Sequence, residues 1–161
     1  MAKRIDIASL PVVTGTMYPS PFDEPCRARQ RTRLGDAANL TQYGVNLVRL
    51  PPGAWSSQRH WHIAQDEFIY IVSGELTLVT DAGAETLRAG DCAGFKAGDS
   101  NGHHLQNRSA ADATFLEMGT RLAEDGAHYP DIDMIVPPHS PAGTYTHRDG
   151  TPYPKQERRG A

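Results

Sequence analysis

With 161 residues, the chain has the length of one compact domain that can fold around its own apolar core without disulfide staples. Its formal net charge of −3 and pI of about 6.1 exclude a general attraction to nucleic acid phosphates. Two cysteines far apart in the chain indicate a reducing compartment. No apolar run approaches the ~20 residues that span a bilayer, and the N-terminal stretch lacks a signal-peptide core. We therefore expect a cytoplasmic protein that binds neither nucleic acid nor membrane.

Residues 1–40 show no regular pattern, because prolines at several positions break any long element. Within them, arginines occupy alternate positions, and on a strand all of these would share one face. The arginines are Arg27, Arg29, Arg31 and Arg33. Such a stripe is typical of a charged edge strand that faces solvent. The alternative interpretation is an anion-binding stripe that faces a phosphate or a carboxylate.

From residue 45 onward, short apolar and β-branched segments alternate with turn residues. The predicted strands are Val45–Leu50, Glu67–Val72, Glu75–Thr80, Glu85–Arg88, Asp91–Phe95, His103–Asn107 and Ala113–Gly119. No stretch shows helical periodicity over three turns, and no internal repeat occurs. Short strands with closely spaced turn signals predict an all-β sandwich or barrel in a single domain.

The chain divides into three parts by composition. We predict an N-terminal extension with an edge strand at 1–40 and a barrel core at 41–122. Residues 123–161 are expected to form a C-terminal strand and a Pro/Gly-rich tail, which wraps the surface or is partly disordered.

The triplet His60-Trp61-His62 is the first candidate for metal binding. On a strand, residues i and i+2 share a face and two imidazoles can converge on one ion, whereas on a helix they diverge. An isolated pair with this spacing is more often two surface histidines. Glu67 has the opposite parity, so it must lie beyond a turn at the start of the next strand, beside Ile69 and Ile71. An unpaired charge among apolar neighbours is costly, and a metal ion would remove that cost.

Two adjacent histidines supply a further candidate, His103 or His104. Neighbouring residues of a strand point to opposite faces, so only one of the two can join the other candidate ligands. If His103 points inward, then Leu105 and Asn107 share its side. Three imidazoles and one carboxylate suit divalent Fe, Mn, Ni, Zn or Cu, and they leave about two positions of a six-coordinate ion open for water or substrate.

These residues fall in two segments that resemble the motifs of the cupin family, Gly53-x6-His60-x-His62-x4-Glu67-x6-Gly74 and Gly90 to Asn107. The first motif departs by one residue in the spacing after Gly53. In the second, Lys96 stands where a proline is usual, and four residues instead of two separate Gly98 from His103. The ending His103-x3-Asn107 matches as it stands, which favours His103 over His104.

The resemblance covers roughly residues 44–120 and implies a single-domain double-stranded β-helix, the jelly-roll barrel of cupins. It also implies a homodimer, and a small-molecule ligand in the mouth of the barrel. One divalent transition metal ion, Zn, Mn, Fe or Ni, is expected on four residues: His60, His62, Glu67 and His103. A closer similarity, through Arg59–His62, Asn101–Leu105 and Tyr129–Asp133, is to bacterial single-domain cupins loosely labelled as sugar-phosphate isomerases or regulators.

The resemblance leaves three classes of function open. The first is a metalloenzyme that acts on a small polar or anionic substrate, as an isomerase of sugars or sugar phosphates, a lyase or a dioxygenase. The second is a non-catalytic cupin module that binds or senses a small molecule, and the third is a structural or storage protein. Arg49 and Tyr43 are candidate substrate-binding residues if their strand face lines the barrel; otherwise they are packing or rim residues. The sequence identifies no general acid or base.

Overall fold

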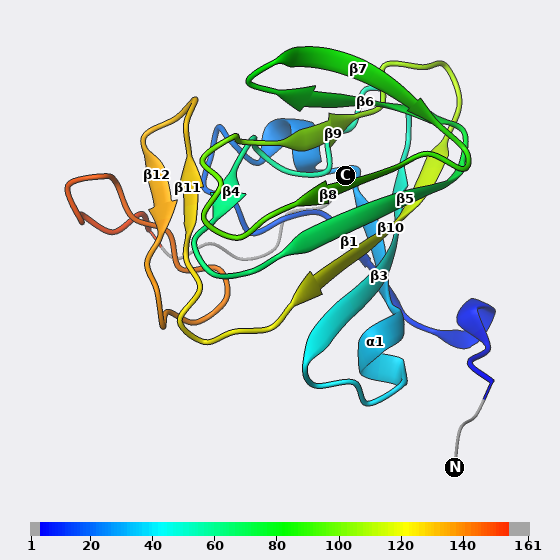
Figure 1. Ribbon diagram of the computed structural model, residues 1–161, viewed down its shortest axis with the longest axis horizontal. Helices are drawn as coiled ribbons and strands as arrows, with labels where there is room; N and C mark the ends of the chain where they lie inside the picture. Colours follow the sequence, from blue (N-terminus) through cyan, green and yellow to red (C-terminus); the bar gives the residue numbers. More distant parts are fainter. Residues whose placement is uncertain (1–3, 155–161) are drawn as a thin grey trace.

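The computed structural model describes residues 4–154, and within them it contains strands, loops and very short helices (Figure 1). The predicted all-β class is therefore confirmed. Residues 1–3 of the expected N-terminal extension and residues 155–161 of the expected tail lie outside the described residues. No helix in the described part of the chain is long and apolar enough to cross a membrane. The cytoplasmic location stays a prediction.

The described residues form twelve strands, two 3₁₀ turns and one helix of four residues. The strands are β1 (Val12–Thr14), β2 (Gln30–Arg33), β3 (Tyr43–Leu50), β4 (Trp61–His62), β5 (Glu67–Ser73), β6 (Glu75–Thr80), β7 (Gly83–Arg88), β8 (Cys92–Phe95), β9 (His104–Gln106), β10 (Ala113–Thr120), β11 (Ala127–Tyr129) and β12 (Met134–Val136). The helical turns are η1 (Ile7–Ser9), η2 (Glu24–Cys26) and α1 (Leu34–Ala37).

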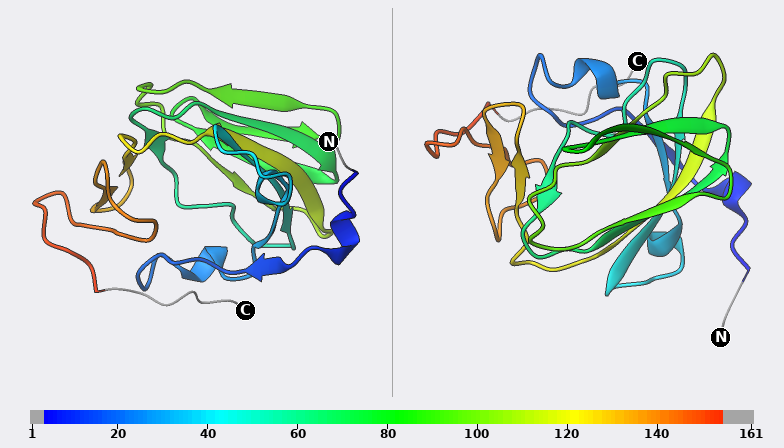
Figure 2. Two further views of the ribbon diagram at one scale, coloured as in Figure 1. Left: turned by 90° about the horizontal axis from the view of Figure 1, so that it is seen from below. Right: turned by 45° about the horizontal axis from the view of Figure 1, so that its top comes forward.

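These strands pair into three antiparallel sheets. The largest has the order β1-β2-β3-β10-β5-β8, and a second has the order β7-β6-β9. A third, β12-β11-β4, flanks the barrel at one end (Figure 1). The first two sheets face each other and enclose the core, as the two views of Figure 2 show. Along the chain, β5, β8 and β10 belong to the first of these sheets, and β6, β7 and β9 belong to the second. A chain that crosses between two facing sheets in this way is typical of a jelly roll.

Alternation along the strands decides which side chains enter this core. In β5, Ile69 and Ile71 are buried while Phe68 and Tyr70 are exposed, as period two requires. The same rule applies to β3 and β10, and side chains from β6, β7 and β9 close the core from the opposite sheet. The core residues are Val48, Leu50, Ala54, Ile69, Ile71, Leu76, Leu78, Leu87, Leu105, Ala113 and Phe115.

A second apolar cluster lies between the third sheet and the N-terminal loops. It contains Tyr18, Cys26, Ala127, Tyr129 and Met134. Tyr18 and Tyr129 meet edge to face with ring centroids 5.7 Å apart. This cluster fastens residues 16–26 and 127–146 to one another, so that much of the sequence outside the barrel core is packed rather than loose.

Two expectations about the N-terminal arginines were wrong. The strand β2 begins only at Gln30, so Arg27 and Arg29 precede it and the four arginines do not form one stripe. Arg29 is buried and donates hydrogen bonds to the carbonyl groups of Ser56 and Gly15, so it ties loops together instead of facing solvent. The edge strand of the sheet is β1, which pairs with β2 from Val12 to Thr14.

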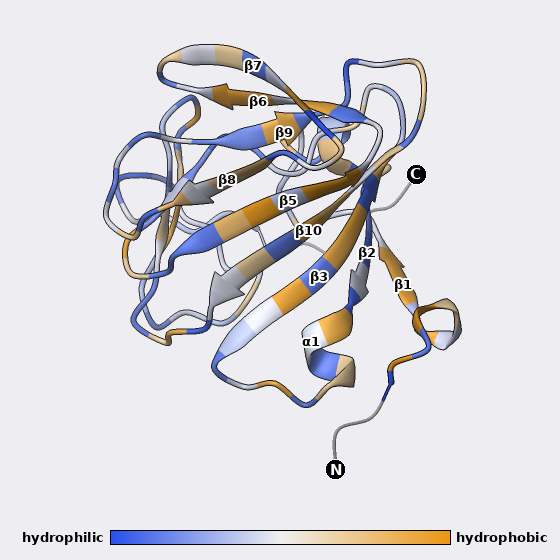
Figure 3. Ribbon diagram, turned by 45° about the vertical axis from the view of Figure 1, so that its right-hand side comes forward, coloured by the Kyte–Doolittle hydropathy of each residue, from blue (hydrophilic) through white to orange (hydrophobic). Residues whose placement is uncertain are grey.

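The outer face of the six-stranded sheet carries several exposed apolar side chains. Its strands fan across the front of Figure 3 in the order β8, β5, β10, β3, β2, β1. Four side chains on this face are each more than two-fifths exposed: Tyr43, Phe68, Tyr70 and Val72. Exposed apolar side chains gathered on one face of a sheet are typical of an interaction surface.

Candidate metal centre

Backbone pairing brings His60 and His103 opposite each other, although 43 positions separate them in the chain. The N–H of each residue donates to the carbonyl of the other, at 3.1 and 2.8 Å. One residue further on, the chain leaves this bridge and pairs with β11, where His62 is opposite Ala127. Because His60 and His62 have the same parity in an extended segment, both rings point into the barrel.

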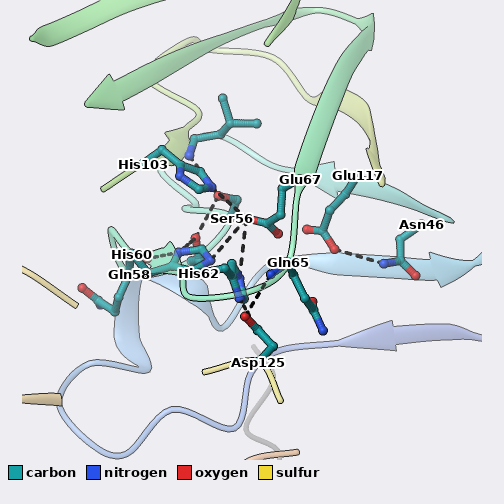
Figure 4. A network of polar contacts seen from close by, with 12 residues as sticks. Asn46, Ser56, Gln58, His60, His62, Gln65, Glu67, His103, Glu117 and Asp125 are labelled. Atoms are coloured by element: carbon teal, nitrogen blue, oxygen red, sulfur yellow. Dashed lines mark hydrogen bonds and ion pairs between the residues drawn. The ribbon is translucent and has the colours of Figure 1, made fainter. Parts of the chain in front are cut away.

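Glu67 is the first residue of β5, as the sequence predicted, with Ile69 and Ile71 on its side. Opposite Glu67 in the adjacent strand lies Gly119, where a Cβ atom would meet Glu67 Cγ at 3.5 Å. The tighter contact of such a Cβ atom would be with the carbonyl oxygen of Asp66, at 3.1 Å, so Gly119 lets the two strands approach closely where β5 begins. Glu67 reaches the three histidines from the opposite sheet (Figure 4).

The four side chains converge on a single point. Glu67 Oε2 lies 2.8 Å from His103 Nε2, 3.7 Å from His60 Nε2 and 3.6 Å from His62 Nε2. Ligand atoms of His60, His62 and Glu67 all lie within 4.8 Å of one another, so these three residues form a cluster that could hold a metal ion. His103 joins them through its hydrogen bond to the carboxylate.

Hydrogen bonds at Nδ1, the ring nitrogen that faces away from Glu67, orient two of the imidazoles. His60 Nδ1–H donates to the carbonyl of Gln58 at 2.9 Å, and His62 Nδ1–H donates to Asp125 Oδ2 at 2.6 Å. Each ring therefore turns the lone pair of its Nε2 toward Glu67. A carboxylate behind a ligating histidine is the usual arrangement in metal sites, because it fixes the tautomer and increases ligand basicity.

Asp125 is itself held in place. Its Oδ1 accepts the backbone N–H groups of Ala64 and Gln65 at 2.9 and 3.1 Å. Burial opposes ionisation of Asp125, but its hydrogen bonds from His62 and from these backbone groups outweigh burial and lower its pKa. Sequence reasoning missed Asp125, because it lies 63 residues from His62 in a loop without a motif or periodicity.

The protonation states of His60 and Glu67 suit a cation. Burial opposes protonation of His62, but its hydrogen bond to Asp125 and the nearby carboxylates outweigh burial and raise its pKa, so a metal ion would displace a proton there. Burial lowers the pKa of His60 to about 3, so that its ring is neutral at physiological pH. Burial alone would raise the pKa of Glu67, but the hydrogen bond from His103 and the three nearby imidazoles outweigh it and hold that pKa at about 2. Neutral imidazole and ionised carboxylate are the forms that bind divalent transition metals.

Aromatic rings restrict two of the histidines from behind. Phe95 stacks on His103 with ring centroids 3.5 Å apart and an interplanar angle of 2°. Tyr129 stacks on His60 at 5.6 Å. Within the described residues His103 Nδ1 is buried and has no hydrogen-bond partner, so packing on Phe95, and not a second hydrogen bond, fixes this ring.

A further carboxylate, Glu117, points into the same interior. It lies on β10, faces inward with Phe115, and lines a small internal cavity with His60 and Glu67. Arg31 and Asn46 hold it, the former at 3.1 Å and the latter at 3.0 Å. The sequence carried a signal for Glu117, because alternation along Ala113–Gly119 places this charged residue on the apolar face.

The other candidates lie outside this cluster. Arg49 is on the outer face of β3, where it bonds Asp112 and the side chain of Gln30. Tyr43 is exposed on the same outer face. Their strand face therefore does not line the barrel, and the structure does not bring either residue to the cluster. His104 points away from His103, as expected, but it is buried against Trp55 and donates to the carbonyl of Ser57.

The cluster opens into a pocket of about 200 Å³ at the mouth of the barrel. His62, Glu67 and His103 line its inner side. The loop between β8 and β9 lines its outer side with polar residues, which are Lys96, Asp99 and Asn101. A small molecule in this pocket would contact the cluster directly.

Comparison with known proteins gives consistent results. A model of the cupin domain family matches residues 46–119. A cupin-superfamily sugar phosphate isomerase from Silicibacter pomeroyi is 45% identical, with a TM-score of 0.88 over 94% of this chain and 97% of that one. A protein from Acidithiobacillus ferrooxidans, named as a candidate sugar phosphate isomerase, is 28% identical, with a TM-score of 0.65 over 73% and 74% of the two chains.

Fold similarity extends further than similarity of sequence. A polyketide cyclase from Streptomyces resistomycificus is 16% identical, with a TM-score of 0.60 over 74% of this chain and 80% of that one. This likeness concerns the fold alone. Among proteins with curated descriptions, none matches this sequence.

Proposed function

The chain belongs to the cupin superfamily, and we propose that it is a metal-dependent enzyme of the sugar-phosphate isomerase type. The observation that carries the proposal is the convergence of three imidazoles and one carboxylate beneath a polar pocket. The names of two similar proteins, at 45% and 28% identity, point to the same class of substrate. The ligands are His60, His62, Glu67 and His103.

The donor set fits a divalent ion. Two ligand atoms about 2.1 Å from one ion lie about 3.0–3.4 Å apart at tetrahedral or octahedral angles. The spacings of 3.6 and 3.7 Å from Glu67 Oε2 to His62 and His60 are close to this range. The contact of Glu67 with His103 is a hydrogen bond that coordination would replace. Zn, Mn, Fe and Ni all accept this combination of ligands.

A divalent ion in this position supplies Lewis acidity toward carbonyl and hydroxyl oxygens, which is what aldose–ketose isomerisation requires. The side chains of the protein do the rest. Asp125 keeps the His62 lone pair directed inward, and the ring of Phe95 excludes water behind His103. Glu117 is the carboxylate of the internal cavity that is not a ligand, and Arg31 and Asn46 hold it there.

The first experiment is metal analysis of purified protein after incubation with Zn, Mn, Fe or Ni and removal of free ions. About one equivalent is expected in the wild type, and none in a variant with His60→Ala and His62→Ala. His147→Ala is the matched control, because His147 pairs with Asp133 on an exposed surface remote from the cluster. Wild-type protein that retains none of the four ions would refute metal dependence.

Turnover is then tested on loaded protein with a panel of aldose and ketose phosphates in D₂O. Isomerisation by proton transfer incorporates deuterium beside the carbonyl, which NMR detects whichever product forms. Exchange is expected in the wild type and is expected to be lost in the double histidine variant. Metal binding without exchange on any member of the panel would favour a binding or sensing module over an isomerase.

The proposed assembly is a homodimer formed through the outer face of the six-stranded sheet. Phe68, Tyr70 and Val72 alternate along this face of β5, and each is more than two-fifths exposed in the single chain. Light scattering after size exclusion is expected to give twice the 17.6 kDa chain mass. Tyr70→Glu is expected to give the chain mass, because it places a charge within the apolar contact. A wild-type mass of one chain would contradict the dimer.

A further inference from the structure

The outer wall of the pocket differs in chemistry from its inner wall. The inner wall carries the candidate ligands, whereas the loop from Lys96 to Asn101 supplies an ammonium, a carboxylate and an amide. The volume of about 200 Å³ is below the roughly 300–1,000 Å³ of sites for drug-sized ligands. The pocket therefore suits a ligand of a few carbon atoms with polar groups at both ends.

Lys96 is distinctive because the chain scarcely uses lysine. The sequence contains three, and two of these, Lys3 and Lys155, lie outside the described residues. The remaining one stands at the rim of the pocket, at the position where the cupin motif usually has proline. Across residues 4–154, no hydrogen bond or ion pair engages the ammonium of Lys96. An ammonium is a compact charge with three rotatable donors, and it binds phosphate well.

Arg59 shows the contrast. Arg59 donates to Asp131 through two nitrogens, at 2.8 and 2.6 Å, and also contacts Asp81. These contacts occupy its guanidinium in holding two loops together. The positive charge available to a ligand in the pocket is therefore that of Lys96.

Two further side chains suit hydroxyl groups. Asn101 Oδ1 accepts the backbone N–H of Asp81 at 2.8 Å, which fixes the amide and leaves its Nδ2 as a donor. Asp99 Oδ1 accepts the N–H of Asn101 at 3.0 Å, which leaves its Oδ2 as an acceptor. A hydroxyl group both donates and accepts, so it matches this pair, whereas Asp99 would repel a phosphate placed beside it.

We propose that Lys96 binds the phosphate of a small phosphorylated polyhydroxy substrate, while Asp99 and Asn101 bind its hydroxyl groups. The other end of the substrate reaches the metal ion held by the histidines and Glu67. This assignment rests on the proposed function and adds the recognition of the phosphate end. Lys96 is exposed and stands at the rim, where it also borders an open groove on the outer face. Its contribution therefore lies at the low end for a charged hydrogen bond, about tenfold in affinity, and decreases with salt.

The test compares D-glycerate with 3-phospho-D-glycerate, which differ only in the phosphate group. Both carry a carboxylate and a hydroxyl for the metal, so glycerate reports the cluster and the difference between the two reports the phosphate subsite. Dissociation constants are measured by calorimetry on metal-loaded protein. The wild type is expected to bind the phosphorylated compound about tenfold more tightly, and Lys96→Gln is expected to abolish that preference.

Two controls separate the local effect from general electrostatics. Arg88→Gln removes an exposed cation on β7, remote from the pocket, and should leave the preference within twofold. Lys96→Arg keeps the positive charge and should retain most of the preference for the phosphorylated compound. A preference that Lys96→Gln leaves unchanged overturns the phosphate subsite while metal dependence stands. Failure of loaded wild-type protein to bind 3-phospho-D-glycerate more tightly than D-glycerate also overturns the subsite, while metal retention and deuterium exchange decide the proposed function separately.

Discussion

Replacement of Asp125 by asparagine changes one oxygen to an amide and tests how the candidate ligand His62 is controlled. In the wild type, Asp125 Oδ2 accepts the Nδ1–H of His62 at 2.6 Å. The oxygen of the introduced amide would still accept the backbone N–H groups of Ala64 and Gln65, which directs its NH₂ group toward His62. The imidazole must then accept at Nδ1 and carry its proton on Nε2, the nitrogen that faces Glu67.

The size of the effect follows from this change of tautomer. Loss of the partner behind a ligating histidine typically reduces metal affinity about 10- to 100-fold. That loss corresponds to about 1.4–2.7 kcal/mol. A bound ion stabilises the folded state by an amount that grows with the logarithm of the metal concentration divided by the dissociation constant. At a fixed excess of metal, the stabilisation therefore falls by the same amount, about 1.4–2.7 kcal/mol. For a domain of this size, with roughly 2–4 °C per kcal/mol, the metal-induced rise in melting temperature should be about 3–11 °C smaller than in the wild type.

The assay is a thermal melt followed by circular dichroism, with and without a fixed excess of Zn or Mn. Asp91→Asn is the matched control, because Asp91 also accepts a backbone N–H, that of Arg88 at 2.7 Å, but lies outside the pocket. Its metal-induced rise should equal that of the wild type. The reasoning is refuted if metal stabilises the Asp125→Asn variant as strongly as the wild type.

Three further predictions concern stability. The hydrogen bond from Arg59 lowers the pKa of Asp131, so this pair stabilises the fold above the unfolded-state pKa near 3.9, and that contribution disappears as the pH falls through the lower folded-state pKa. Asp131→Asn should therefore melt below the wild type at pH 6, and the gap should narrow as the pH falls below about 4. Glu117→Leu should lower the free energy of unfolding in urea by roughly 1–3 kcal/mol, because it leaves the half-buried Arg31 without its carboxylate partner. A second change, Arg31→Met, should recover part of that loss. Strictly additive losses from the two substitutions would contradict the pairing of Arg31 with Glu117. Phe115→Ala removes a fully buried ring and should cost about 3–5 kcal/mol, whereas a loss below about 1 kcal/mol would contradict its place in the core.

The barrel strands could be predicted from the sequence because particular residue types mark where each strand begins and ends. The predicted strand Glu75–Thr80 agrees with β6 at both ends. Gly74 precedes it with a φ of +74°, and a Cβ atom there would lie 2.7 Å from the carbonyl oxygen of Asp112. A glycine is required at such a turn, so its presence in the sequence marks the boundary. The position of Glu67 at the start of β5 could also be predicted, because its odd separation from His62 excludes it from the same strand face.

The segments outside the barrel could not be predicted, because their structure depends on distant partners. The alternation of arginines from Arg27 to Arg33 has the period of a strand, yet Arg29 turns inward to the carbonyl of Ser56. That contact joins residues 27 positions apart and leaves no local pattern. Asp125 escaped notice for the same reason. Period-two patterns show which face of a strand is buried, but they do not show which loop will cover it.

The charges inside the barrel show where a preference for an anionic substrate must come from. Glu117 is neutralised by Arg31 and therefore does not contribute net charge to the site. Burial keeps His60 neutral, and Glu67 is ionised. A divalent ion on these ligands would leave one net positive charge on the cluster, and the ionised Asp125 behind His62 would balance it. The interior of the barrel therefore does not by itself select an anion. The proposed preference for a phosphorylated substrate depends on Lys96 at the rim, which is why replacement of this one residue should remove it.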